Sequence, residues 1–382
     1  MKRPAHLIAL IILVLSAFLG TQNLYADTPT YSCEIRNGSF VSAQVFEFDV
    51  YLTQTGVTPL ELACFNTGIL LNSGFINGGT ITPALMGGSE LNASQVPLNI
   101  AYDPAFFCVK IAPRKPPRDY VTGVTSGTLI SNTSGTKVCR VRLTNSVAFG
   151  NDPLNYNWSM NLMPYHTVVS AFVTETSPYV NTAITNAISH SKSENLVLFL
   201  EGLYLAGTGN RKAQDESGDH FAGPVADLVT VELAEATSPF GTVYTAENVL
   251  LYTGGKCSFS IPGELSGSYY VVVKHRNSIE TWSASPVSFA SGTVNYDFST
   301  AAGQAFGNNM QQMGTVFVFF GGDQSQDGIV DGSDMAAIDN ASTSVLSGYN
   351  TEDINGDGLV DGSDMAVIDN NSTAVVTAQK PN

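Results

Sequence analysis

The sequence predicts a mainly β protein with two β-sandwich domains followed by a small α-helical module. Between about residue 30 and residue 320, short apolar and alternating runs are separated by glycine, proline and asparagine turns. After residue 320 an acidic segment occurs twice. We therefore expect a leader (1–26), a first sandwich (27–175), a linker (176–194), a second sandwich (195–320) and a C-terminal module (321–382).

The first 26 residues have the composition of a secretory signal peptide. Lys2 and Arg3 precede an apolar run over residues 7–19, and small and polar residues lead to Ala26. A membrane-spanning helix is the alternative, but this run is shorter than the roughly 20 residues that a bilayer requires. We expect cleavage after Ala26 and a secreted or cell-surface protein. No second long apolar run follows, so no membrane span is expected in the mature chain.

The charge of the chain excludes some partners and points to another. The net charge is −16 with a pI near 4.5, which argues against nucleic acid or an anionic membrane as a partner. Eleven of the 33 acidic residues lie between Asp323 and Asp369, and Lys380 is the only basic residue from position 323 onward. This concentration of negative charge predicts a bound cation.

The mature chain has an odd number of cysteines, without zinc-type spacing. We interpret them as apolar core residues with one disulfide at most, whose pairing the sequence leaves open. They are Cys33, Cys64, Cys108, Cys139 and Cys257.

The first sandwich is predicted to have a jelly-roll-like or related architecture. Its clearest strand covers residues 45–52, in which Phe46, Phe48, Val50 and Leu52 share one face. Further strands are predicted at 60–64, 68–71, 106–111, 137–144, 156–160 and 167–173.

The second sandwich is predicted to be Ig-like or transthyretin-like, because turn residues recur every 8 to 12 residues or so. The preceding linker is rich in Thr, Ser, Asn and Ala, with weak periodicity. Strands of the second sandwich are predicted at 196–205, 228–235, 241–251, 257–261, 269–275, 279–282 and 292–298.

The acidic repeat has the spacing of calcium-binding loops. Residues 323–340 recur 30 positions later as residues 353–370, and Gly328 and Gly358 occupy position 6 of the two loops. Calcium takes six to eight oxygen ligands, which a twelve-residue loop with a glycine turn can supply. We expect two Ca²⁺ ions, one in each loop. The predicted ligands are the side chains at positions 1, 3, 5, 9 and 12 and the carbonyl at position 7, namely Asp323, Ser325, Asp327, Ile329, Asp331 and Asp334, and Asp353, Asn355, Asp357, Leu359, Asp361 and Asp364.

A short helix is predicted after each loop. Val330 and Val360 are expected to pair with each other in a short strand, and the helices to break at Asn340 and at Asn370. The small core of the module is predicted to contain Met335, Ile338, Met365 and Ile368.

Aspartate at position 12 of both tandem loops resembles dockerin type I over about residues 321–372. The resemblance implies a symmetric pair of EF-hand-like loop–helix units with two calcium ions. It also implies docking onto a cohesin in polysaccharide-degrading complexes, through the residues matching 332–333 and 362–363. The Lys/Arg pair usual on such helices is absent here. The strand at 46–52, followed by residues 68–72, faintly resembles a cohesin or carbohydrate-binding sandwich. The expected partner of the module is a cohesin-like domain or a β domain of the same chain, with a polysaccharide as a further possible ligand.

Three other groups have a functional and a structural interpretation. The first group suggests a sugar or acid site but fits a surface strand and turn better; it contains His275, Arg276, Glu280 and Trp282. The second is His220, which suggests a metal ligand but fits an ordinary polar loop better. Tyr156, Trp158, Tyr165 and His166 suggest a sugar-stacking platform, against core packing.

No GxSxG, HExxH, P-loop or dinucleotide motif is present. We therefore predict a secreted, non-catalytic, calcium-binding surface or scaffolding protein. The alternatives are a carbohydrate-binding accessory protein and a glycoside hydrolase.

Overall fold

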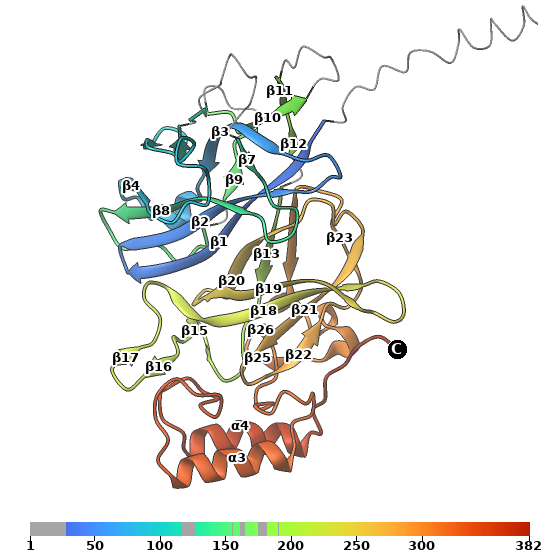
Figure 1. Cartoon of the computed structure of the whole chain (residues 1–382). Helices are drawn as coiled ribbons and strands as arrows, with labels where there is room; N and C mark the ends of the chain where they lie inside the picture. Colours follow the sequence, from blue (N-terminus) through green and yellow to red (C-terminus); the bar gives the residue numbers. More distant parts are fainter. Residues whose placement is uncertain are drawn as a thin grey trace, which may run out of the picture.

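The computed structural model describes residues 28–112, 114–115, 127–154, 156–160, 165–174, 182–189 and 191–382. The predicted leader over residues 1–26 lies outside this part of the chain. Two β units are stacked one above the other, and a pair of helices lies at the far end (Figure 1). None of the helices in the described ranges is long and apolar enough to cross a membrane.

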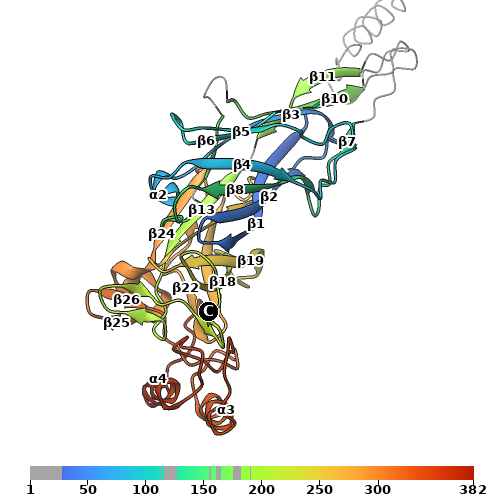
Figure 2. The same cartoon turned by 90° about the vertical axis from the view of Figure 1, so that its left-hand side faces the viewer.

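The first β unit, residues 30–189, is a sandwich of two sheets that share one apolar core. One sheet has the order β12-β1-β2-β8-β4 and the other the order β11-β10-β3-β6-β5, with β7 and β9 also paired to β3. Figure 2 shows the two layers edge on. The strands are β1 (Thr30–Ser42), β2 (Val45–Gln54), β3 (Glu61–Leu70), β4 (Ile81–Met86), β5 (Ile100–Asp103), β6 (Cys108–Ile111), β7 (Thr128–Leu129), β8 (Thr136–Asn145), β9 (Asn157–Trp158), β10 (Val168–Thr174), β11 (Thr182–Asn186) and β12 (Ile188–Ser189).

Strand β2 shows why the first unit forms a sandwich. Phe46, Phe48, Val50 and Leu52 are all buried in the core, as the alternating pattern predicted. The opposite face of β2 is not apolar. It carries Glu47 and Asp49, which form ion pairs with side chains of the neighbouring strand β8: Arg140 Nε lies 2.8 Å from Glu47, and Lys137 Nζ and Arg140 Nη1 each lie 3.0 Å from Asp49.

The predicted linker over residues 176–194 contains strands, so that prediction needs correction. β11 pairs with β10, β12 pairs in parallel with β1, and β13 (Lys192–Val197) already belongs to the second unit. Strand pairing uses backbone groups, so a segment with weak apolar periodicity such as β11 can extend an existing sheet edge. The change from one unit to the next therefore falls near residue 190.

The second β unit, residues 192–320, is built from two further sheets around its own core. The larger sheet has the order β19-β18-β21-β22 with β23 beside β21, and the smaller has the order β20-β13-β24. These strands are β18 (Val225–Glu235), β19 (Thr242–Tyr252), β20 (Lys256–Ile261), β21 (Ser268–His275), β22 (Ser278–Trp282), β23 (Val287–Ser288) and β24 (Thr293–Asp297). Mainly β architecture with sandwich units is thus confirmed.

Short ribbons and turns complete the second unit. The strand predicted over 196–205 ends at Val197, because the chain turns there and Tyr204 donates its N–H to the carbonyl of Leu200. The remaining elements are β14 (Tyr204–Leu205), β15 (Gly209–Asn210), β16 (Gln214–Asp215), β17 (Gly218–Asp219), β25 (Gln311–Met313), β26 (Val316–Val318) and the 3₁₀ turns η1 (Phe298–Thr300), η2 (Ala302–Gln304) and η3 (Phe306–Asn308).

The described residues contain three short α-helices: α2 (Ser73–Ile76), α3 (Gly332–Thr343) and α4 (Gly362–Thr373). The predicted breaks at Asn340 and Asn370 do not occur, since α3 and α4 each continue for three further residues. Asn371 explains this in α4. Its side-chain amide is buried and donates to the Glu201 carboxylate (2.6 Å) and to the Gly321 carbonyl (2.8 Å), so it does not compete for the helix backbone.

All five cysteines are free thiols. Four are fully buried and Cys64 is half-buried, which confirms their interpretation as core residues. Burial raises the pKa of the Cys108 thiol to about 11 and that of Cys139 to about 12, so both stay protonated and unreactive at neutral pH.

One carboxyl group in the second core has no hydrogen-bond partner. Glu194 lies on the central strand β13, between Phe259 of β20 and Val294 of β24, and is 0% exposed. Neither of its carboxylate oxygens has a partner. Burial raises its pKa from 4.5 to about 8, so the folded protein holds this side chain in its neutral form at pH 7.

Replacing Glu194 by glutamine is expected to remove a pH dependence of stability. Between the unfolded pKa of 4.5 and the folded pKa of about 8, only the folded chain keeps this proton. The free energy of unfolding should therefore fall by about 1.4 kcal/mol per pH unit over that window. Urea unfolding of Glu194→Gln and of the parent at a series of pH values should diverge in favour of the variant as pH rises. Glu247→Gln, at an exposed position of β19, is the matched control. Parallel stability profiles for Glu194→Gln and the parent would contradict the assignment.

Candidate metal centre

The two repeats fold into equivalent loops, here called loop 1 (residues 323–334) and loop 2 (residues 353–364). The first aspartate of each loop is buried, with Asp323 at 1% and Asp353 at 0% exposure. In loop 1, the Asp323 carboxylate accepts the N–H groups of Asp327 and Gly328, both at 3.2 Å. In loop 2, Asp353 accepts the corresponding N–H groups of Asp357 (3.1 Å) and Gly358 (3.0 Å). The first side chain thus organises the turn around it.

The last aspartate of each loop closes the same turn from the other side. Asp334 accepts the N–H groups of Ser325 (3.1 Å) and Asp331 (3.0 Å), and Asp364 makes the same two bonds in loop 2 at 2.9 Å each. The bond to Asp331 is half of a capping box that starts α3. Positions 1 and 12 of each loop are therefore brought together by the start of the following helix.

The buried carboxylates of each loop affect one another. Burial, followed by the charge of Asp334, raises the pKa of Asp323 to about 6, and burial raises the pKa of Asp353 to about 6. In contrast, hydrogen bonds from Ser333 lower the pKa of Asp331, the helix cap. The raised values show carboxylates that are costly to ionise without a neighbouring positive charge.

Left-handed backbone positions shape the turns. Gly328 and Gly358, predicted for position 6, have φ of +85° and +82°. A second left-handed position was not predicted. It lies at position 4, where Gln326 has φ of +60° and Gly356 has φ of +70°. Gly356 in loop 2 could have indicated a left-handed position from the sequence. Loop 1 has Gln326 there, so the repeat does not show a shared glycine at position 4.

The described residues contain no group of three or more His, Cys, Asp or Glu side chains that could hold a metal ion by themselves. Each loop instead brings two buried carboxylates together. The position 5 side chains, Asp327 and Asp357, accept the N–H groups of Ile329 and Leu359. Each of these bonds uses one carboxylate oxygen, Oδ1, so the other oxygen remains as a further acceptor. Calcium accepts carboxylate, hydroxyl, amide and carbonyl oxygens in flexible geometry, so the predicted donor set fits it better than it fits zinc.

The strand pairing between loops differs from the prediction. Val330 donates its N–H to the carbonyl of Val376 (3.0 Å), and Val360 donates to Leu346 (2.9 Å). Val330 and Val360 therefore do not pair with each other. Each loop is bound by the segment that follows the other loop's helix, which gives the module a reciprocal, two-fold arrangement. The predicted core residues do pack together, with Ile338 and Ile368 buried and Met335 and Met365 half-buried.

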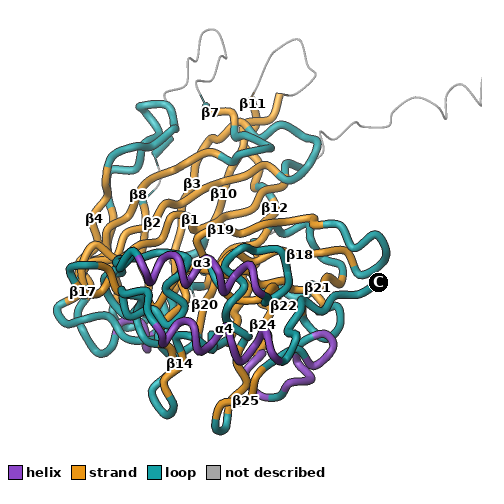
Figure 3. The backbone as a smooth tube through the Cα atoms, turned by 90° about the horizontal axis from the view of Figure 1, so that it is seen from below, coloured by secondary structure: helices purple, strands orange, loops and turns teal. Residues whose placement is uncertain are grey.

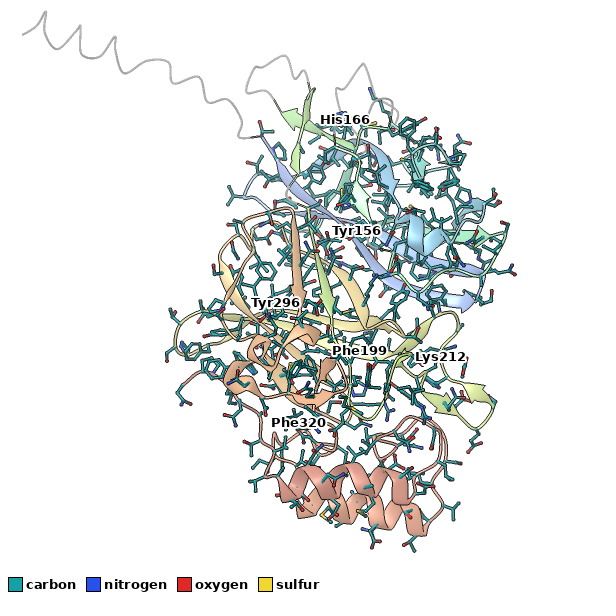
Figure 4. All side chains as sticks on the ribbon, turned by 180° about the vertical axis from the view of Figure 1, so that it is seen from behind. Tyr156, His166, Phe199, Lys212, Tyr296 and Phe320 are labelled. Carbon is teal, nitrogen blue, oxygen red and sulfur yellow. The ribbon has the colours of Figure 1, made fainter. Side chains whose placement is uncertain are left out.

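The module shares its core with the second β unit. Ile279 of β22 is fully buried in the same cluster as Ile338 and Ile368. Figure 3 shows α3 and α4 side by side across this end of the molecule, and Figure 4 places Phe320, which packs against the cluster, where the second unit meets the module. The module is therefore packed against the β sheets and does not form a separate tail.

Polar contacts fix loop 2 to the second unit. Arg276 Nη1 (2.8 Å) and Asn277 Nδ2 (2.9 Å) both donate to the carbonyl of Asp353, the first residue of loop 2. The Arg276 guanidinium lies 3.1 Å from the buried carboxylate of Asp227, which also accepts the Tyr349 hydroxyl. Burial opposes ionisation of Asp227, but His275 and Arg276 hold its pKa well below the usual range.

The sugar or acid site suggested by the sequence is not formed: His275, Arg276, Glu280 and Trp282 do not come together in one place. His275 Nε2 lies 3.2 Å from Asp227 and Arg276 joins the same cluster. Glu280 instead accepts the indole N–H of Trp282 at 2.5 Å. The group therefore divides in two. Asp227, His275 and Arg276 form a charged cluster beside loop 2, here called the docking cluster, and Glu280 and Trp282 contact each other separately on β22.

His220 and the aromatic group also have structural roles. The His220 ring stacks on Tyr349 with centroids 4.1 Å apart, beside the docking cluster. Tyr156 is buried and packs edge-on against Trp158. The Tyr156 hydroxyl is hydrogen-bonded to Ser260 of the second unit, and Figure 4 shows Tyr156 between the two β units. Tyr165 packs against Phe106. Tyr156 and Trp158 thus form one pair, and Tyr165 forms a separate pair with Phe106, which was not in the predicted group.

Comparison with known proteins identifies no family. No family model matches the chain, and no curated protein matches it. Among solved structures, a 35 kDa C-terminal fragment of the major pilin GBS80 of Streptococcus agalactiae aligns at 7% identity, covering 71% of this chain and 99% of the pilin fragment, with a TM-score of 0.21. Full-length major pilin SpaD from Corynebacterium diphtheriae aligns at 8% identity, over 70% of this chain and 64% of SpaD, with a TM-score of 0.20. At these scores neither alignment establishes a common fold or function.

The resemblance to dockerin type I over residues 321–372 is wrong, as is the cohesin resemblance of the N-terminal domain. No family model and no curated protein, dockerin or cohesin included, matches the chain. A complete EF-hand, with a helix on both sides of its loop, is not seen either. Each loop is followed by one helix, as predicted, and no described helix immediately precedes it. The sequence pattern identified the loops, but it did not determine the family.

Adding a methyl group at Gly202 is expected to displace loop 2 from the second unit. A Cβ there would lie 2.0 Å from the Ile354 carbonyl oxygen, so the two backbones must separate. For Gly202→Ala we expect a loss of about 1–3 kcal/mol in unfolding free energy. Hydrogen exchange should show faster exchange confined to residues 321–382. Gly292→Ala, where a Cβ meets no atom within 4 Å, is the control. Unchanged exchange in the module of Gly202→Ala would show that this contact does not hold it.

Proposed function

We propose that this chain is an exported, non-catalytic surface protein whose C-terminal module binds two calcium ions. The observation that carries the proposal is the equivalence of the two loops. Thirty residues apart, both place buried aspartates at positions 1 and 12 with the same backbone hydrogen bonds. A solvated acidic tail would not need two such matched turns.

Electrostatics supports a divalent cation as the ligand. Each loop contains four carboxylates within twelve residues. In the described part of the chain, no ion pair with a basic side chain involves the carboxylates of loop 1. Burying aspartates together without a counter-charge is costly, and a bound calcium ion would remove that cost. Ion binding is therefore proposed to stabilise the folded module.

The partner proposed for the module is the second β unit of the same chain. Ile279 contributes to the core of the module, and Arg276 and Asn277 hold the start of loop 2. Calcium would then fix the end of the chain to its β sheets. Support for a non-catalytic role comes from His275 and Glu280, which are used in separate structural contacts.

Calorimetric titration of the full exported chain should detect uptake of two calcium ions. Asp323→Ala should abolish binding at loop 1 and Asp353→Ala binding at loop 2, each lowering the stoichiometry from two ions to one, because each removes the buried ligand around which its turn is built. Ligand loss is expected to weaken the affected site by at least about a hundredfold. The full chain is required because the core of the module includes Ile279.

The matched control is Asp339→Ala, which removes an exposed acidic residue of α3 outside the ligand positions. It should retain both ions. Chelation of calcium should lower the melting temperature of the parent, as expected for a ligand that binds the folded state. Absence of heat from calcium uptake by the parent, together with unchanged melting on chelation, would refute the proposal.

A further inference from the structure

The two loops differ in what surrounds them. Loop 1 is bound by the segment after α4, where Ala378 donates its N–H to Gly328. Loop 2 contacts the second β unit directly, and Gln214 donates its N–H to the Gly356 carbonyl at 3.1 Å. Among the described contacts, a basic side chain from the second β unit reaches the ligand side chains of loop 2 and none reaches those of loop 1.

That side chain is Arg211, which follows β15 in the second unit. Its Nη1 atom lies 3.2 Å from both the backbone carbonyl and the side-chain Oδ1 of Asn355, and 3.9 Å from Asp357 Oδ2. Asn355 and Asp357 occupy positions 3 and 5 of loop 2. The guanidinium thus contacts the two side chains that are predicted to coordinate the second ion.

The position of Arg211 is fixed by the fold. Its backbone N–H is bonded to the Leu203 carbonyl at 2.7 Å, and its side chain is about two-thirds buried, at 33% exposure. Arg276, the other arginine beside loop 2, is ion-paired with Asp227, and its described hydrogen bond to loop 2 goes to the backbone carbonyl of Asp353. Arg211 is therefore the basic group that directly contacts predicted ligand side chains.

We propose that Arg211 acts as a resident cation of loop 2, competing with calcium and making the second site weaker than the first. This inference rests on the proposed calcium function and deepens it, because it makes the two sites unequal. Calcium entering loop 2 must separate the guanidinium from the Asn355 and Asp357 oxygens. It must also overcome the repulsion of a positive charge a few ångströms away. In loop 1, Ser325 and Asp327 have no such competitor among the described contacts.

The proposal has a structural corollary for the protein without calcium. Arg211 partly neutralises loop 2, so loop 2 can stay packed against the second unit when calcium is absent. Loop 1 has no comparable contact and should loosen first. The order of calcium binding on titration is then loop 1 before loop 2.

The test is calcium titration of the full chain carrying Asp323→Ala, so that the remaining heat reports loop 2 alone. In this background, Arg211→Gln should tighten calcium binding on the order of tenfold, because it removes the competing charge while keeping a polar side chain. Arg211→Lys keeps the charge and should bind within about threefold of the Arg211 protein. Lys212→Gln is the matched control, since it removes an adjacent positive charge whose partner is Asp219; it should also change affinity by less than about threefold.

A second measurement separates folding from binding. Hydrogen exchange without calcium should show faster exchange in loop 2 of Arg211→Gln, with the β sheets unchanged. Unchanged or weaker calcium binding in Arg211→Gln, with intact sheets, would overturn the role of Arg211 while leaving calcium binding in place. If the Asp323→Ala protein and the parent both take up no calcium, the proposed function fails, and the role of Arg211 fails with it. Equal affinities for the two ions in the parent would also overturn the proposal.

Discussion

One buried carboxylate, that of Asp227, connects the second β unit to the C-terminal module. It is 0% exposed and contacts His275, Arg276 and Tyr349. Arg276 extends from this carboxylate to the first residue of loop 2. A buried charge is tolerated only when it is paired and hydrogen-bonded, so removing one partner leaves the others with an uncompensated cost. Asp227 lies on β18, and loop 2 begins more than a hundred residues later in the sequence. The contacts of Asp227 therefore help to hold loop 2 against this sheet.

The sequence predicted those features that depend on local pattern. Alternation in residues 45–52 identified β2 and the face of its core, and the 30-residue repeat located both loops and their following helices. Each of these signals can be read from the order of residues in one continuous stretch of the chain. The length of α4 was underestimated because Asn371 satisfies its amide through Glu201, a residue distant in the sequence.

Other features depend on contacts that no local pattern contains. Val330 pairs with Val376 and not with Val360, because each loop is bonded to the segment that follows the other loop's helix. β11 and β12 extend sheet edges through backbone bonds, without apolar alternation. Arg211 reaches Asn355 from 144 positions away. The family assignment was wrong for a related reason, since a short ion-binding pattern constrains a loop and says little about the rest of the chain.

The crossed pairing within the module determines the order in which its parts can form during synthesis. Loop 2 is held by residues 346–348, which have already been made when loop 2 appears. Loop 1 is held by residues 376–378, which are made after loop 2 and α4. A chain that emerges amino end first can therefore complete its later loop before its earlier one. The backbone bonds that hold loop 1 therefore cannot form until residues 376–378 have been made.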